Sequence, residues 1–220
     1  MEEKSKPKLI LNPISKIIPE EYLSNNKTIE ILILLEGFTE IRKYAFYNCT
    51  NLKKVFLPES LEIIGEHAFY HCESLPKIEI PDNVKTIEEF AFYHCKSLTK
   101  IELSKSLETL GKYAFYECNS LPKIEIPDEV KTIGEYTFYN CISLTEIKLP
   151  ESLETIGKCA FSSCKSLPEI KIPNSVKTVG FDVFYDCDSL QEIIIDNTEK
   201  FVKQNWDKDW NYGCDAKITY

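Results

Sequence analysis

The same arrangement of residues returns every 23 positions along most of this chain. The stretch FYHCESLPKIEIPDNVKTIEEFAFYHC, residues 69–95, begins and ends with the same four letters. Seven cysteines mark the interval, and each has a phenylalanine three residues before it and a leucine three residues after it. They are Cys49, Cys72, Cys95, Cys118, Cys141, Cys164 and Cys187. A period of about 20–50 residues is typical of stacked repeat architectures.

Each unit contains a short segment in which apolar and polar residues alternate, as in KIEIP. Alternation that ends at a proline predicts a half-buried strand. These segments lie in one register from Leu9 to Ile218, which gives ten strands. A second, weaker alternation follows in segments such as VKTI. The stretch before each cysteine has room for only a helical turn, because so short a helix is unstable alone.

One 23-residue unit cannot bury its apolar face by itself, so neighbouring units must stack. We therefore expect a β-dominated α/β repeat solenoid. Its ten strands would form a parallel concave sheet with a spacing of about 4.8 Å, and short turns or 3-10 pieces would lie on the convex side. The chain would be one continuous domain. It divides into an N-terminal cap with a degenerate repeat (1–27), the 23-residue repeats (28–195) and a closing segment (196–220).

Composition limits the classes of function. With 43% hydrophobic residues, the 220-residue chain can bury a core. Its net charge of −9 is spread among interspersed charges of both signs, which disfavours a nucleic-acid partner. The start, MEEKSKPKLILNP, lacks the apolar core of a signal peptide, and no apolar run approaches the length of a membrane span. We expect no membrane insertion, and the compartment stays open.

Nine cysteines raise the question of metal or disulfide chemistry. No CxxC pair occurs, and stacked cysteines would have parallel rather than converging Cβ vectors. The favoured interpretation is a ladder of small, buried, reduced side chains, with isolated disulfides as the alternative. Cys159 replaces the aromatic residue of its column and is expected to be exposed. Cys214 in the closing segment has no clear assignment.

Three histidines deserve the same question. The spacing of His67, His71 and His94 could bring three imidazoles together. Other units place Tyr, Phe, Asn, Glu or Ser in these columns, so the positions are interpreted as variable surface, and no metal or cofactor is expected. No nucleophile–base pair, phosphate loop or carboxylate dyad stands apart from the repeat. We therefore expect no catalytic residue and no enzyme, because catalysis needs a unique constellation of groups.

The outward side chains of the ten strands are the leading candidates for binding. At the N-terminal end they are apolar, at Ile10, Ile31, Ile33 and Phe56. Exposed apolar residues that break the alternation usually mark an interaction site. The hypothesis is that a protein, or a second copy of this chain, docks there, unless residues 1–8 or the tail cover the patch. Charged outward residues would set its orientation: Lys77, Glu79, Lys100, Glu102, Lys123, Glu125, Glu146 and Lys148.

A stripe of tyrosines on the opposite, convex edge is an alternative surface. It recurs once per unit, which favours aromatic stacking between units as its role. A sugar- or protein-binding strip is the other interpretation. The stripe comprises Tyr47, Tyr70, Tyr93, Tyr116 and Tyr139, and after a break at Ser162 it continues with Tyr185.

The consensus LxxIxIPxxVxxIGxxAFxxC resembles the BspA-like class of leucine-rich repeats. Representative stretches are SLPKIEIPDEVKTIGEYTFYNC and SLTEIKLPESLETIGKCAFSSC. The resemblance implies a right-handed arc that presents its concave face to protein or glycan partners, often in adhesion, at a cell surface or in secreted proteins. It carries no catalytic residues. Glu88 stands where Gly is usual, and Ser104 and Asp196 stand where Pro is usual; all three affect turns rather than a site.

Together these features predict a protein-interaction module, adhesive or scaffolding in role. The alternative is a purely structural or consensus-designed solenoid without a natural ligand. Units of the type SLPKIEIP alternate with units of the type SLTKIEL, which gives a longer period of 46 residues. Either tandem duplication or deliberate design would leave such a pattern.

Overall fold

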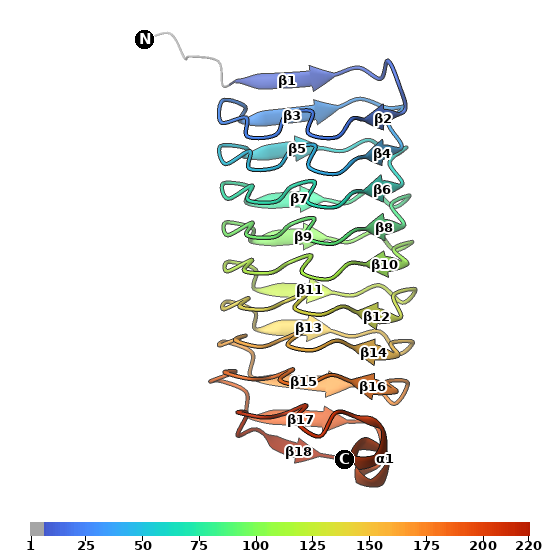
Figure 1. The fold of residues 1–220 in the computed structure, drawn as a ribbon, viewed down its shortest axis with the longest axis vertical. Coiled ribbons are helices and arrows are strands. Elements are labelled where there is room, and N and C mark those ends of the chain that lie inside the picture. The colour runs from blue at the N-terminus through green and yellow to red at the C-terminus, as the bar shows by residue number, and fades with distance from the viewer. Residues whose placement is uncertain (1–6) are drawn as a thin grey trace.

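The ten strands predicted from the alternating segments all form. The computed structural model describes residues 7–220, and in it these strands lie side by side in one row along the stack (Figure 1). Regular ladder pairing is interrupted after β5, β9 and β13. The row consists of β1 (Lys8–Leu11), β3 (Ile31–Leu34), β5 (Lys54–Phe56), β7 (Lys77–Glu79), β9 (Lys100–Glu102), β11 (Lys123–Glu125), β13 (Glu146–Lys148), β15 (Glu169–Ile172), β17 (Glu192–Ile195) and β18 (Lys217–Thr219).

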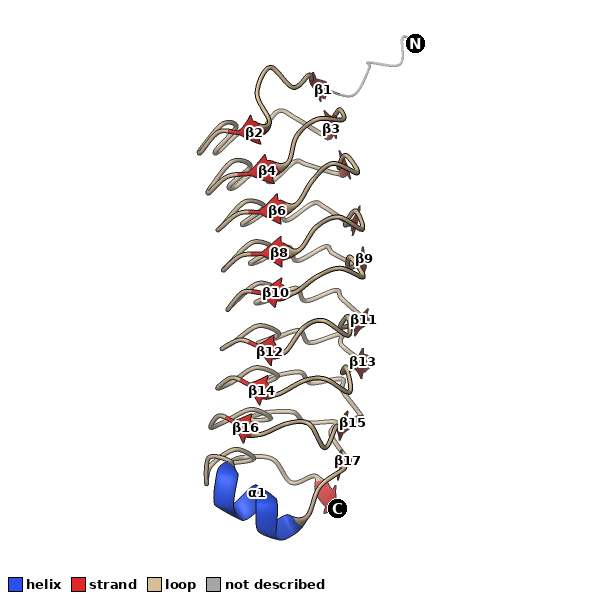
Figure 2. Cartoon of the chain, turned by 90° about the vertical axis from the view of Figure 1, so that its right-hand side faces the viewer, coloured by secondary structure: helices blue, strands red, loops and turns tan. Residues whose placement is uncertain are grey.

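The weaker alternation forms a second row of two-residue strands, and both rows appear in profile in Figure 2. All strand pairs are parallel, with partners such as Leu9 and Leu32 separated by one repeat. The predicted fold class is confirmed as a parallel solenoid of about 9 turns. The second row consists of β2 (Ile17–Ile18), β4 (Glu40–Ile41), β6 (Ile63–Ile64), β8 (Thr86–Ile87), β10 (Thr109–Leu110), β12 (Thr132–Ile133), β14 (Thr155–Ile156) and β16 (Thr178–Val179).

The core between the two rows is built from columns of identical residues. One phenylalanine per rung is fully buried, and neighbouring rings lie 5.3–5.8 Å apart between centroids. Leucines such as Leu98 and Leu121 and the inward residues of the strands surround this column. The phenylalanines are the largest fully buried side chains of the core, and burial of each ring stabilises its rung. The column comprises Phe46, Phe69, Phe92, Phe115, Phe138, Phe161 and Phe184.

The turn before each cysteine has an unusual backbone. Two residues per rung, four positions apart, adopt positive φ, for example His67 (56°) and His71 (57°). This region costs roughly 1–2 kcal/mol for a residue with a side chain. The N–H of each of these two residues donates to a carbonyl of the next rung, at 3.0 Å to Glu89 and 2.8 Å to Tyr93. The strained backbone is therefore offset by hydrogen bonds between rungs.

The C-terminal segment closes the core. Helix α1 (Glu199–Asn205) begins after Thr198, whose hydroxyl accepts the N–H of Phe201. Trp206 and Trp210 are buried, and the Trp210 ring meets Phe184 edge-on at 6.1 Å. At the other end, β1 and β2 already form a rung within residues 7–27, while residues 1–6 of the predicted N-terminal cap lie outside the described residues. No helix in residues 7–220 is long and apolar enough to cross a bilayer.

Candidate functional site

The apolar outward residues at the N-terminal end form a continuous patch. Ile10 pairs with Ile33, and Ile33 pairs with Phe56, so three apolar side chains lie in line on neighbouring strands. Ile31 lies beside them, next to Lys8 and Lys54. Ile10 and Phe56 are 46% and 44% exposed, and the ammonium of Lys54 lies 4.7 Å from the Phe56 ring. We call Ile10, Ile31, Ile33 and Phe56 the N-terminal patch. The suggestion that residues 1–8 cover it falls largely outside the described residues.

The rest of this sheet face carries lysines and glutamates, and most of these charges form ion pairs with one another. The register places Lys77 beside Lys100 and Glu79 beside Glu102, which puts like charges on neighbouring strands. Ion pairs along each strand offset this: Lys77 to Glu79 at 2.7 Å and Lys100 to Glu102 at 2.6 Å.

The order of the two charges reverses further along the same face. Lys123 pairs with Glu146 and Glu125 with Lys148 across the strands, and the side chains of Glu125 and Lys148 form an ion pair. The middle of the sheet face therefore offers little unpaired charge to a strongly charged ligand.

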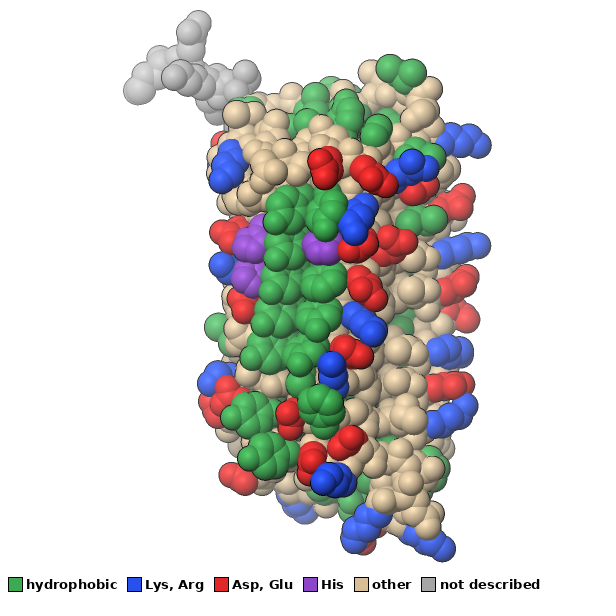
Figure 3. All heavy atoms as spheres, viewed as in Figure 1, with side chains coloured by type: hydrophobic (Ala, Val, Ile, Leu, Met, Phe, Trp, Pro, Cys, Tyr) green, Lys and Arg blue, Asp and Glu red, His purple; other side chains and the backbone are tan. Residues whose placement is uncertain are grey.

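The tyrosine stripe is one half of a wider aromatic surface. Its rings stack at 4.5–4.9 Å between centroids, with interplanar angles of 2–13°. A second column, which contains Tyr44, His67, Phe90, Tyr113 and Tyr136, runs beside it with spacings of 4.6–4.9 Å. Figure 3 shows the two columns as a hydrophobic band along the stack. We call them the aromatic ribbon.

The aromatic ribbon confirms the stacking interpretation. Because each ring face lies against the ring of the next rung, the ribbon presents mainly ring edges and hydroxyls. A sugar ring stacks on an aromatic face, so the ribbon offers a poor platform for it except at its two ends. Burial between its neighbours raises the pKa of the Tyr93 hydroxyl.

The three histidines do not converge. The His67 ring lies between Tyr44 and Phe90, both at 4.6 Å, within the aromatic ribbon. His71 and His94 lie together on its flank, with ring centroids 4.5 Å apart. The expectation that three imidazoles could meet is therefore wrong for His67, because its ring is held in the stack between Tyr44 and Phe90, whereas His71 packs beside His94.

The seven in-register cysteines are buried, as predicted. Each thiol donates to the carbonyl of the phenylalanine 26 residues earlier, for example Cys95 to Phe69 at 3.3 Å; Cys49 meets Leu23 instead. Desolvation raises the pKa of Cys95 to about 12, so these thiols are poor nucleophiles.

The two cysteines outside the register differ from each other. The expected exposure of Cys159 is wrong, since it is only 7% exposed. The hydrogen bond between Cys159 and Tyr136, together with burial, raises the pKa of that tyrosine to about 12. Cys214 is half-buried in the closing segment.

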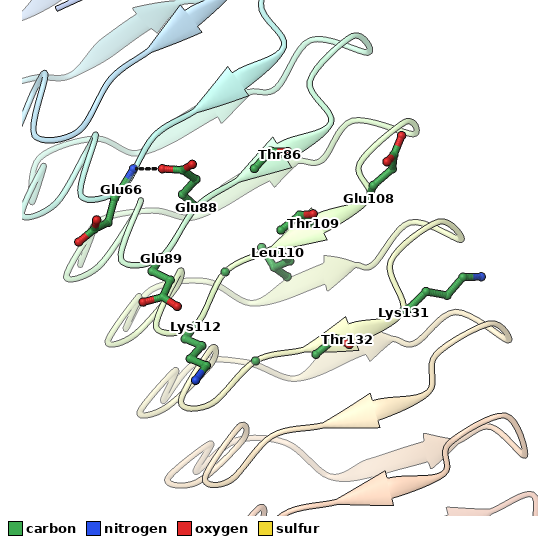
Figure 4. Close-up of a pocket in the computed structure, with 12 residues that line it drawn as sticks. Glu66, Thr86, Glu88, Glu89, Glu108, Thr109, Leu110, Lys112, Lys131 and Thr132 are labelled. Atoms are coloured by element: carbon green, nitrogen blue, oxygen red, sulfur yellow. Dashed lines mark hydrogen bonds between the residues drawn. The ribbon is translucent and has the colours of Figure 1, made fainter. Parts of the chain in front are cut away.

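A shallow groove of about 590 Å³ crosses β8, β10 and β12 on the second row (Figure 4). Its floor carries Thr86, Thr109 and Thr132, and charged residues form its rim. Glu88 stands there in the glycine column, and its carboxylate accepts the backbone N–H of Glu66 at 2.8 Å. The departure from glycine therefore creates a local contact between two turns. The groove is open and rimmed by charged residues, as is typical of ordinary solvated surface.

Comparison with known proteins addresses the fold. The BspA type leucine-rich repeat region matches residues 16–141 and 108–206, in six copies. A leucine-rich repeat protein of T. pallidum is 28% identical, with a TM-score of 0.69 over 73% of this chain and 78% of that one. The pneumococcal vaccine antigen PcpA is 20% identical, with a TM-score of 0.61 over 97% and 67%. No curated protein sequence matches.

The repeat consensus, the rung geometry and the matched residues agree with one another. The family match spans almost all of the repeats between residues 16 and 206. The solved structures share the solenoid fold. This chain belongs to the BspA-type leucine-rich repeat family.

Proposed function

We propose that this chain is a protein-interaction module that docks its partner on the outward face of the ten-strand row. The N-terminal patch carries the proposal: it is the place on that face where apolar side chains stand in line, in register, where later rungs carry lysine and glutamate. Solvent-exposed apolar runs of this kind usually mark binding surfaces.

The surrounding charges support this assignment. Beside the patch, two ion pairs form a polar rim: Lys77 with Glu79 and Lys100 with Glu102. Because these charges are already paired, the rim is compatible with a partner of either net charge. The aromatic ribbon is the weaker candidate for docking, because its ring faces are occupied within the stack. Leucine-rich repeat solenoids are generally non-enzymatic, and we propose no catalytic role.

By the resemblance of its repeat, the role would be adhesive or scaffolding, at a cell surface or outside the cell. The partner would insert apolar side chains between Ile10, Ile33 and Phe56, where a hot spot would form at the centre of the contact. A second copy of this chain could bring its own N-terminal patch to the same place. A solenoid without a ligand would leave the patch as unused exposed surface.

The double variant Ile33→Glu with Phe56→Lys tests the docking surface. Peptides selected from a displayed library against the wild-type chain should lose binding to this variant by at least tenfold, and any self-association seen by sedimentation should disappear. The melting temperature should stay nearly unchanged, because both side chains point outward.

The matched control is Ile142→Glu with Phe181→Lys, which makes the same chemical changes at two other exposed positions. The control should keep all binding. Equal binding by the wild type and both variants would show that the patch is not the docking surface. A patch variant that melts several degrees earlier would show that the patch belongs to the folded core.

A further inference from the structure

A small cluster of nitrogen and carboxylate groups lies on the flank of the aromatic ribbon. His71 and His94 occupy the same position of consecutive rungs, and Glu73 follows two residues after His71. Their candidate ligand atoms all lie within 4.8 Å of one another. The shortest separation, from Nδ1 of His71 to Oε1 of Glu73, is 3.1 Å. By sequence alone, His71 and His94 are interpreted as variable surface.

The backbone and the rings hold both imidazoles in place. His71 and His94 have φ values of 57° and 58°, and the backbone N–H of each donates to a backbone carbonyl of the next rung at 2.8 Å. The His94 ring stacks on Tyr93 at 4.4 Å, and the His71 ring lies against Tyr70 at 4.7 Å. A ligand set that is positioned before the ion arrives loses little conformational freedom on binding.

One imidazole nitrogen in the cluster lacks a hydrogen-bond partner. Nε2 of His94 lies 3.0 Å from a carboxylate oxygen of Glu117, while Nδ1 is buried and unsatisfied. A neutral ring that donates Nε2–H to Glu117 leaves a free lone pair on Nδ1, which is the form that binds metals.

We propose that His71, Glu73 and His94 form a zinc-binding site that joins two consecutive rungs. Two imidazoles and a carboxylate are ligands that Zn²⁺ accepts, at bond lengths of about 2.0–2.2 Å. Ligand atoms around a tetrahedral zinc ion are roughly 3.3–3.6 Å apart at those bond lengths, so side-chain shifts of about 1 Å close the site. Three protein ligands leave a fourth position for water or for a group of a partner.

A lysine already competes for the carboxylate. Nζ of Lys96 lies 3.2 Å from the same Oε1 of Glu73 that faces His71. Zinc must displace this ammonium to use that oxygen, so removing it should strengthen binding. Glu117 supports the site from outside, and outer groups of this kind typically change metal affinity by about 10–100-fold.

Zinc titration of the full chain by calorimetry tests the proposal. The protein is prepared without a histidine tag, stripped with chelator and carries Cys214→Ser to remove the partly exposed thiol. We expect one zinc ion per chain and no binding of Mg²⁺. His71→Asn or His94→Asn should weaken zinc binding at least tenfold, whereas Lys96→Met should strengthen it. Asparagine suits these positions because Asn48 and Asn140 hold the same place with φ of 56°.

His67→Phe is the matched control, because its column already contains Phe90 and His67 lies apart from the cluster. This variant should bind zinc like the wild type. A titration without zinc binding at millimolar concentration would overturn the proposal. So would equal affinity in the wild type, His94→Asn and His67→Phe, which would indicate an adventitious ion only.

Discussion

At the scale of single residues, the cysteine column shows why one residue type recurs. Each cysteine of the column is buried, with at most 6% of its surface exposed, in a core that suits a small side chain of weak polarity. The thiol also donates to a backbone carbonyl of the preceding rung, at 3.1–3.4 Å along the column. Alanine would fill less volume and would lose this weak hydrogen bond. The column is therefore a packing feature, and its chemistry is suppressed by burial.

Burial of the thiols predicts loss of stability at alkaline pH. Desolvation raises the pKa of Cys95, Cys141 and Cys187 to about 12 in the folded chain, against about 8.5 in an unfolded one. The contribution of each is complete below about pH 8.5 and is lost as pH rises towards 12, since the unfolded state then releases the proton first. The slope is about 1.4 kcal/mol per pH unit for each thiol.

Cys141→Ser removes one of these titrations, because serine does not ionise in this range. Urea unfolding at pH 7 and pH 10 should show that the variant loses about 2 kcal/mol less than the wild type between the two values. Its stability at pH 7 provides the control for altered packing. An identical loss in both proteins would mean that Cys141 ionises in the folded state as easily as in the unfolded one.

Exposure of the thiols also predicts which cysteine reacts. Cys214 is half-buried, and the other eight cysteines are buried. Treatment with a maleimide without denaturant should modify Cys214 within minutes and leave Cys159 unmodified until the chain unfolds. Mass spectrometry of the labelled peptides identifies the site. Rapid labelling of Cys159 would contradict its burial beside Tyr136.

At the scale of the rung, each element is stable only through its neighbours. Strands of two to four residues and turns with positive φ cannot persist alone. The sequence repeats them in one register, so many backbone N–H groups that point along the stack donate to a carbonyl of the adjacent rung. The unit of folding is therefore the whole rung and its two interfaces.

Removal of one complete repeat should consequently be tolerated. Deletion of residues 97–119 joins Lys96 to Ser120. The junction then reads CKSL, the same sequence that residues 95–98 have in the full chain. We expect a folded protein whose melting temperature, measured by circular dichroism, falls by no more than about 10 °C. Deletion of ten residues, 97–106, shifts the register and should abolish cooperative melting. Similar behaviour of both deletions would argue against stacking of equivalent rungs.

At the scale of the whole molecule, the two ends are where the repeat cannot satisfy itself. The last phenylalanine of the column, Phe184, packs against the Trp210 ring where the earlier ones pack against the phenylalanine of the next rung. Trp206 lies edge-on to Trp210 at 5.2 Å, and Val202 of α1 completes the cover. Near the other end, the first three strands of the row, β1, β3 and β5, carry the N-terminal patch on their outward face. The two ends therefore differ: one is closed by its own chain, and the other carries the proposed docking surface.

Trp210→Ala should open the closed end. Truncation of a buried tryptophan costs about 3–5 kcal/mol, which corresponds to a fall of roughly 6–20 °C in the melting temperature of a chain of this length. Exposure of Phe184 should also increase aggregation, measured by light scattering on heating. Tyr212→Ala is the control, because Tyr212 is 63% exposed and should change stability by less than about 0.5 kcal/mol. Equal melting temperatures would show that Trp210 does not stabilise the last rung.

The sequence alone determined the solenoid, the register of its ten strands, the phenylalanine core and the burial of the seven cysteines. The reason is that an exact period forces equivalent residues into equivalent environments, so one alternating segment decides all of them. The outward positions of Ile10, Ile33 and Phe56 followed from the same alternation.

Only the tertiary structure decided which side chains meet at the turns between the strands. The His67 ring packs in the aromatic ribbon while Glu73 joins His71 and His94, in a turn where two residues per rung have positive φ. Asparagine and aspartate at five of these positions, Asn25, Asn48, Asn140, Asp182 and Asp186, were the signal for such a backbone. The burial of Cys159 depends on the side chains of the adjacent rungs. These lie 23 residues away in sequence and a few ångströms away in space.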